Sequence, residues 1–197
     1  MKKSALLLFF LGIAVFAWSQ ENEKEKGFKK ENLFSGGTIS LSFFNNTFLI
    51  GANPVLGYRL ANWVDGGIVV NYQWTSIRDY PRTDDRTRQS IYGGGVFARL
   101  FPINFLFAQV QVEHNFINQK LIPGPNSFSS KENFTTSANS LLIGGGYTSG
   151  RDKYTNTPFF YMSILFDVSG NQNSPYIDSR GRTIPIIRGG VNIPLFQ

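Results

Sequence analysis

The sequence predicts an all-β fold, namely a transmembrane eight-stranded antiparallel up-and-down β-barrel. Eight segments alternate apolar and polar residues, no helical segment is present to cover their apolar faces, and the connections alternate in length. The alternation is clearest in Asn104–Ile117, where Leu106, Val110 and Val112 share one parity. The opposite parity holds Gln109, Gln111, Glu113 and Asn115. A closed barrel with lipid outside and a polar, packed interior satisfies such segments.

The first residues have the pattern of a secretory signal peptide. A basic start at Met1–Lys3 precedes an apolar run from Ala5 to Trp18 and a small residue, Ser19. We expect residues 1–19 to be removed by cleavage near Ser19. A retained N-terminal anchor is the alternative, but the run is short for a membrane helix of about 20 residues. The chain has no cysteine, which excludes a lipoprotein anchor.

Residues 20–35 are rich in Glu and Lys and offer little to bury. We interpret this stretch as a flexible periplasmic lead-in, followed by an outer-membrane barrel over residues 36–197.

The first half of the barrel is predicted to contain four strands. They are Gly36–Phe44, Thr47–Leu60, Gly66–Ile77 and Gln89–Phe101. Asn45 and Asn46 favour a tight turn after the first strand. Pro54 lacks a backbone donor, which predicts a bulge or kink within the second strand.

The second half is predicted to contain four more strands. They are Asn104–Ile117, Ala138–Ser149, Pro158–Val168 and Thr183–Phe196. In the seventh strand Phe160, Met162 and Ile164 are expected to face outward, and in the eighth Arg188 and Asn192 are expected to face inward.

Three long connections are expected outside the cell. They are Arg78–Arg88, Asn118–Ser137 and Ser169–Arg182. Bacterial outer-membrane barrels combine short periplasmic turns with longer external loops and an even strand number. The predicted strands, such as Thr47–Leu60, are long enough to cross an apolar band of about 25 Å at a tilt near 45°.

Inward parity brings several charged and amide side chains into the lumen. The predicted lumen cluster consists of Arg59, Arg99, Glu113, Asp167, Arg188, Gln73, Gln109 and Gln111. An eight-stranded barrel is just wide enough to be filled by side chains, so we expect salt bridges within this cluster and no open channel. The alternative is a path for an ion or a small solute.

Composition excludes several function classes. The formal charge of +6 is spread along the chain, which argues against a nucleic-acid partner. The glycine triplets at 93–95 and 144–146 lack the lysine and helix of a phosphate-binding loop. No HExxH, carboxylate cluster or EF-hand pattern occurs, so no metal and no cofactor are expected. The glycines are better explained by a narrow barrel that needs room for aromatic rings.

His114 is the single histidine, and it lies on the apolar parity of the fifth strand. An outer-membrane acyl hydrolase would place a serine two residues later, where this chain has Phe116. Ser90 or Tyr92 of the neighbouring strand would then have to act as partner, and no complete set of nucleophile, base and orienting group is evident. We therefore expect an interfacial histidine and a protein that is not an enzyme.

Six aromatic side chains are expected to form girdles at the two membrane interfaces. They are Tyr58, Trp63, Tyr72, Trp74, Tyr92 and Tyr147.

With these features the chain resembles small outer-membrane barrels of the eight-stranded OmpX type, in a form found in Bacteroidota. The resemblance is carried by Trp18-Ser19-Gln20, by the glycine- and aromatic-rich strands, and by the ending from Arg188 to Gln197. It implies partners in outer-membrane lipid, lipopolysaccharide and the barrel-insertion machinery, which recognises a C-terminal aromatic residue such as Phe196. It also implies a non-enzymatic role in envelope integrity, adhesion or accessory interaction, with a possible surface ligand for the long loops. The alternatives are transport of a small or apolar solute and, second, a lipid-modifying enzyme.

Overall fold

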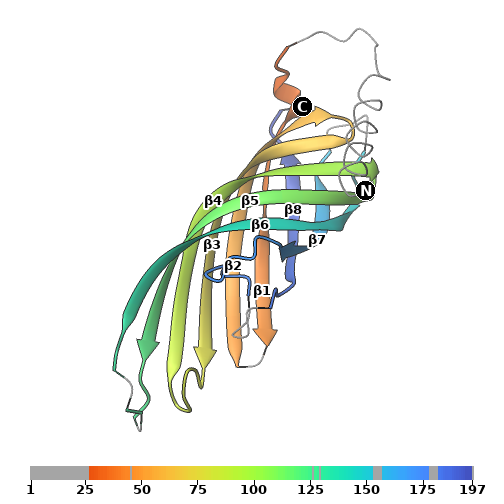
Figure 1. Ribbon diagram of the computed structural model, residues 1–197. Helices are drawn as coiled ribbons and strands as arrows, with labels where there is room; N and C mark the ends of the chain where they lie inside the picture. Colours follow the sequence, from red (N-terminus) through yellow and green to blue (C-terminus); the bar gives the residue numbers. More distant parts are fainter. Residues whose placement is uncertain are drawn as a thin grey trace, which may run out of the picture.

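The computed structural model describes residues 27–44, 46–125, 127–128, 130–152, 157–177 and 182–196. A short 3₁₀ helix, η1 (Lys30–Asn32), precedes eight strands (Figure 1). The strands are β1 (Leu33–Phe44), β2 (Thr47–Ala61), β3 (Val64–Arg78), β4 (Arg86–Ile103), β5 (Leu106–Ile122), β6 (Asn133–Ser149), β7 (Phe159–Asp167) and β8 (Ile186–Pro194). The predicted signal peptide lies outside the described residues.

The eight strands form one closed antiparallel barrel, as the sequence predicts. Each strand pairs with the next along the chain, and β1 closes the ring by pairing with β8. We call the end that holds Leu33 and Pro194 the terminal end, and the opposite end, with the 79–85 and 123–132 connections, the distal end (Figure 1). Among the described residues, no helix is long and apolar enough to span a membrane.

Side chains alternate between the two faces as predicted. Along β7, Phe160, Met162, Ile164 and Phe166 are exposed, whereas Tyr161, Ser163, Leu165 and Asp167 are buried. β5 follows the same rule over its first twelve residues. Val110 and Val112 face outward, and the buried polar residues are Gln109, Gln111, Glu113 and Asn115. The period of two therefore gives the correct orientation of the sheet.

Several strands extend beyond their predicted ends. β1 begins at Leu33, and Phe34 is buried in the lumen, so the barrel starts within the predicted lead-in of residues 20–35. β5 continues to Ile122 and β6 begins at Asn133, which leaves only residues 123–132 of the predicted loop Asn118–Ser137. The residues that β5 and β6 add, 118–122 and 133–137, are mostly polar on the outward face. Apolar alternation ends where the outward face becomes hydrophilic, although backbone pairing continues.

Pro54 does not shift the register, so of the predicted bulge or kink the structure shows no bulge. The pairs Ala52↔Tyr72 and Val55↔Val69 keep the same register on either side of it. Because proline cannot donate a backbone hydrogen bond, the ladder is interrupted there without insertion of a residue. Register shifts occur instead at Arg59/Ala61 and at Leu100/Ile103, next to the turns of the terminal end.

Two strand glycines make room for aromatic rings inside the barrel, as expected. A Cβ at Gly57 would lie 2.2 Å from the ring of Phe34, and one at Gly146 would lie 2.6 Å from the ring of Phe107. Substitution at either position would push a ring out of the packed lumen.

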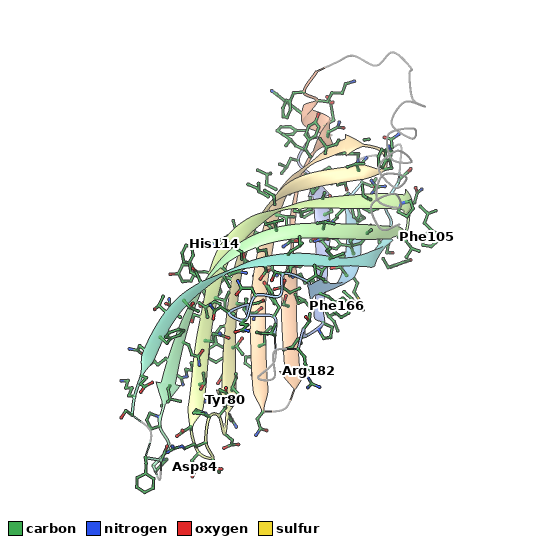
Figure 2. The ribbon with its side chains drawn as sticks, viewed as in Figure 1. Tyr80, Asp84, Phe105, His114, Phe166 and Arg182 are labelled. Atoms are coloured by element: carbon green, nitrogen blue, oxygen red, sulfur yellow. The ribbon has the colours of Figure 1, made fainter. Side chains whose placement is uncertain are left out.

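The outer surface carries aromatic side chains at two levels. Tyr72, Tyr92 and Phe116 are directly opposite one another on β3, β4 and β5, and all three are exposed. Trp63, Tyr147 and Phe105 are exposed at the terminal end, where Figure 2 shows Phe105 pointing away from the barrel. Of the six predicted girdle residues, Tyr58 and Trp74 are only partly exposed. Tyr58 stacks on Phe28, with ring centroids 5.3 Å apart, and Trp74 meets Phe48 edge-on.

Candidate functional site

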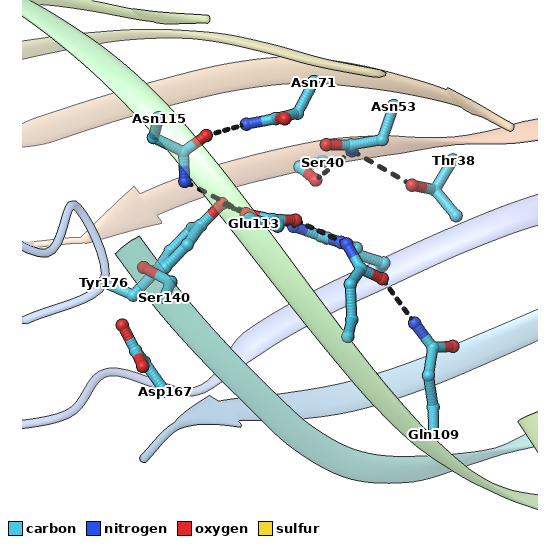
Figure 3. A network of polar contacts seen from close by, with 12 residues as sticks. Thr38, Ser40, Asn53, Asn71, Gln109, Glu113, Asn115, Ser140, Asp167 and Tyr176 are labelled. Carbon is cyan, nitrogen blue, oxygen red and sulfur yellow. Dashed lines mark hydrogen bonds and ion pairs between the residues drawn. The ribbon is translucent and has the colours of Figure 1, made fainter. Parts of the chain in front are cut away.

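A ladder of polar side chains from β5 runs through the centre of the lumen (Figure 3). The side chain of Arg99 donates from Nε to Gln109 Oε1 at 2.9 Å, and Gln109 Nε2 donates to Gln111 Oε1 at 2.7 Å. Gln111 in turn donates to Glu113. Because alternate residues of one strand point into the same lumen, one segment can build a continuous chain of hydrogen bonds along the barrel axis.

Glu113 lies at the centre of this network and is almost fully buried. Its Oε1 is 3.2 Å from the Arg188 guanidinium of β8, which gives the ion pair expected within the predicted cluster. Its Oε2 accepts from Asn115 Nδ2 at 3.1 Å and from the Tyr176 hydroxyl at 2.6 Å. Several donors and one cation thus replace the water that this carboxylate loses on burial.

Tyr176 comes from the connection between β7 and β8, which folds back into the distal opening of the lumen. Tyr176 is 5 % exposed, and the preceding Ser174 donates from its hydroxyl to Asp167 Oδ2 at 2.5 Å. The Asp167 Oδ1 atom accepts from the backbone N–H groups of Leu141 and Ser169. This corrects the prediction that Ser169–Arg182 lies wholly outside the barrel, because Ser174 and Tyr176 are lumen residues.

The electrostatics of this loop favour a protonated tyrosine. Burial, followed by the nearby Glu113 carboxylate, raises the pKa of Tyr176 above its ordinary value of 10.0. The hydroxyl therefore remains a donor to Glu113 at neutral pH. It also lies 3.4 Å from Arg188 NH2, so the loop contacts both members of the ion pair.

Aromatic rings fill the lumen toward the terminal end. Phe101, Phe107, Phe159 and Tyr161 form one buried cluster. The Arg99 guanidinium lies against it, with its central carbon 4.2 Å from the ring centroid of Tyr161 and 5.5 Å from that of Phe107. Arg99 is therefore held by cation–π contacts and by Gln109, and among the described residues it forms no ion pair of the kind expected for it.

Arg151, which no pattern in the sequence singles out, closes the terminal end. Its NH2 group lies 3.5 Å from Asp65 Oδ1 and donates to the carbonyl of Asn62 at 3.1 Å, so it joins the β6–β7 connection to the β2–β3 turn. Its guanidinium also lies 3.6 Å from the ring centroid of Phe101. Burial lowers the pKa of Arg151, and the Asp65 carboxylate opposes that effect. Arg151 lies in a connection, where the alternation that orients strand residues gives no information.

The structure brings together most of the predicted lumen cluster. Arg99, Gln109, Gln111, Glu113, Asp167 and Arg188 are buried in the lumen. Gln73 is half-buried and reaches Thr75, and Arg59 is half-buried opposite Asp65. A second group joins β1 and β2, where Asn53 donates to Thr38 and Ser40 (Figure 3). Within the described residues, no group of three or more His, Cys, Asp or Glu side chains is arranged to hold a metal.

His114 points away from the barrel (Figure 2). Its Nδ1 atom is 2.6 Å from Asn139 Oδ1 of β6, and its ring packs edge-on against Phe116. Neither candidate partner, Ser90 or Tyr92, is opposite His114 in the sheet. Ser90 is opposite Asn118, four residues farther along β5, and Tyr92 stacks on Phe116. A His–Asn pair at this level lacks the nucleophile that acyl transfer requires.

The lumen is thus filled at three levels. The β7–β8 connection occupies the distal opening, the β5 ladder occupies the centre, and the aromatic cluster with Arg99 and Arg151 occupies the terminal end. Such an arrangement joins opposite walls of the barrel through contacts inside the lumen.

The similarity of this chain to known proteins is found among solved structures. No family model matches the sequence, and no curated protein matches it. Among solved structures, the N-terminal β-barrel domain of Pseudomonas aeruginosa OprF is similar, with 14 % sequence identity and a TM-score of 0.41. The match covers 82 % of this chain and 96 % of the OprF domain. The closed eight-stranded barrel described here follows from the chain's own strand pairing.

Proposed function

We propose that this protein spans the bacterial outer membrane as a filled, non-conducting barrel and presents its distal hairpins at the cell surface. The main support for this proposal is the contrast between the two faces of the sheet. Between the levels of Leu106 and Phe116 most outward side chains are apolar, and the exposed His114–Asn139 pair is a polar exception. The charged side chains of Arg99, Glu113 and Arg188, by contrast, are buried in the lumen. Lipid is the environment that suits such an exterior.

The dimensions of the apolar surface support a membrane location. On β5 the exposed apolar side chains run from Leu106 to Phe116, ten residues apart. At about 3.4 Å per residue and a tilt of about 45°, this corresponds to a height of about 24 Å, close to the band of outer-membrane barrels. The next outward residues along the sheet are polar, with Ser90, Asn118 and Thr135 opposite one another across β4, β5 and β6.

The distal part of the barrel supports a role in surface interaction. Beyond Phe116 the β3–β4 and β5–β6 hairpins continue past the short strands β7 and β8 (Figure 1). β7 pairs with β6 only over Leu142–Ser149, so most of the distal half of β6 is not covered by β7. The outward side chains there, including Asn133, Thr135 and Ser137, are exposed and polar. We assign to this region a role in envelope integrity, adhesion or accessory interaction. The resemblance to OmpX-type barrels supports the same assignment.

Conductance and fractionation test the proposal together. The purified barrel should migrate at different apparent masses before and after heating, and should be recovered in the outer-membrane fraction. In planar bilayers it should give no steady conductance, because the lumen is filled. Recovery of a folded protein from the soluble periplasm would refute the membrane location. Stable open channels would support the second candidate, transport of a small solute, for which the β7–β8 connection would have to leave the lumen.

A further inference from the structure

Two pairs of cations lie on the outward face of the distal hairpins. Arg88 of β4 is directly opposite Lys120 of β5. On the other side of the same strand, Arg86 is directly opposite Arg78 of β3. Arg86 is half-buried and the other three are exposed. Because Arg86 and Arg88 are two residues apart on β4, they share one face and join the two pairs into a single surface, which we call the distal basic patch.

The charges of the distal basic patch are not balanced within the sheet. Like charges directly opposite each other on neighbouring strands are destabilising. Beyond the level of Phe116, the outward positions of β3, β4 and β5 contain no Asp or Glu, and none of the four cations forms an ion pair with a described residue. In the adjoining β3–β4 connection, Asp79 accepts from Asn46 at Oδ2 and from the backbone N–H of Asp84 at Oδ1. The patch therefore favours an anion from outside the chain.

The height of the distal basic patch matches the headgroup layer of a membrane. Tyr92 and Phe116 end the apolar band, and Arg88 and Lys120 each lie four residues beyond them on the same strands. At about 3.4 Å per residue and a tilt of about 45°, their backbones lie about 10 Å beyond those of the aromatic residues. Interfacial aromatic rings mark the edge of the hydrocarbon, and long cationic side chains extend back toward it. The charged groups are therefore at the level of lipid phosphates.

We propose that the distal basic patch binds the phosphate groups of a phosphorylated glycolipid of the lipid A class in the outer leaflet. A phosphate monoester carries about −1.5 to −2 charges at neutral pH, so two such groups balance the four cations. The phosphodiester of a glycerophospholipid carries one negative charge and leaves most of the patch unbalanced. Arginine presents a fork of N–H donors that fits phosphate oxygens, and lysine adds a point charge. The inference rests on the membrane location proposed above, with the distal end outside the cell.

Native mass spectrometry of the detergent-solubilised barrel measures this binding. The probes are a lipid A with two phosphates, the same lipid with one phosphate removed, and phosphatidylglycerol. Wild type should bind the lipid with two phosphates most tightly and phosphatidylglycerol least tightly. Each cation beside an anionic lipid surface changes the binding constant about fivefold, so Lys120→Gln should weaken binding of the lipid with two phosphates about fivefold, and Arg88→Gln with Lys120→Gln about 25-fold. Lys30→Gln is the matched control, because Lys30 is an exposed lysine at the terminal end.

Unfolding in lipid-free detergent separates lipid binding from folding. Because Arg88 and Lys120 repel each other, the urea midpoint of the double variant should equal or exceed that of wild type. A lower midpoint would show that the two side chains stabilise the barrel themselves, and would overturn the proposal. Equal binding of the three lipids by wild type, or unchanged binding by the double variant, would overturn it as well. If the same barrel is recovered in the outer-membrane fraction, those results leave the membrane location intact, whereas recovery from the soluble periplasm would overturn both proposals.

Discussion

The hydroxyl of Tyr176 donates to Glu113 Oε2 across 2.6 Å, although the two residues are 63 positions apart in the chain. This contact fixes the β7–β8 connection inside the barrel, next to the Glu113–Arg188 ion pair. It therefore joins a connection, which sequence patterns describe poorly, to the most strongly polar strand of the sheet.

Removing this hydroxyl should loosen the connection. Tyr176→Phe leaves Oε2 of a buried carboxylate with one donor fewer, which should cost about 1–3 kcal/mol of unfolding free energy. The measurement is urea unfolding in detergent, combined with limited proteolysis of the connection. Tyr80→Phe is the control, because Tyr80 is an exposed tyrosine of the β3–β4 connection and should behave as wild type. Equal stability of Tyr176→Phe and wild type would mean that the connection is not held by this contact.

The same contact predicts a loss of stability at alkaline pH. The pKa of Tyr176 is raised in the folded protein, so the native state keeps a proton that the unfolded chain loses above its ordinary pKa of 10.0. Stability from this group is fully present below about pH 10 and falls as the pH rises further. Urea midpoints measured on both sides of this pH should show a steeper fall for wild type than for Tyr176→Phe. Parallel pH profiles would contradict the assignment.

The Glu113–Arg188 pair should show strong coupling. Glu113→Gln leaves Arg188 buried without its counter-charge, and breaking a buried pair in this way costs about 3–5 kcal/mol. Replacing both residues, as in Glu113→Gln with Arg188→Met, should cost less than the sum of the single changes. Unfolding free energies of the three variants and wild type form the cycle. Additive effects would show that the two charges do not interact.

His114 should be dispensable for lipid chemistry. His114→Asn removes the imidazole but keeps an exposed polar side chain beside Asn139. Because neither Ser90 nor Tyr92 is opposite His114 in the sheet, the lipid A acylation pattern of cells expressing the variant should match that of cells expressing wild type. A pattern that changes with wild type and reverts with His114→Asn would establish the lipid-modifying alternative.

The parts of the structure that sequence reasoning predicts share one physical cause. In a sheet with an apolar outer face and a polar lumen, residues of the two kinds alternate, and this rule orients Glu113, Asp167 and Arg188 correctly. The rule fails beyond the apolar band, where β5 continues to Ile122 with polar residues on its outward face. It also gives no information about connections. Tyr176 and Arg151 enter the lumen from outside the strands, and their positions depend on partners far away in the chain.

The most direct measurement is the accessibility of single cysteines along β5. The chain has no cysteine, so each introduced one is unique. Spin labels at Val110→Cys and Val112→Cys, in barrels reconstituted in bilayers, should collide with oxygen dissolved in lipid and be shielded from a water-soluble nickel complex. A label at Asn118→Cys should show the opposite. If the nickel complex reaches Val110→Cys and Val112→Cys as readily as Asn118→Cys, the apolar face of this barrel does not lie in a membrane.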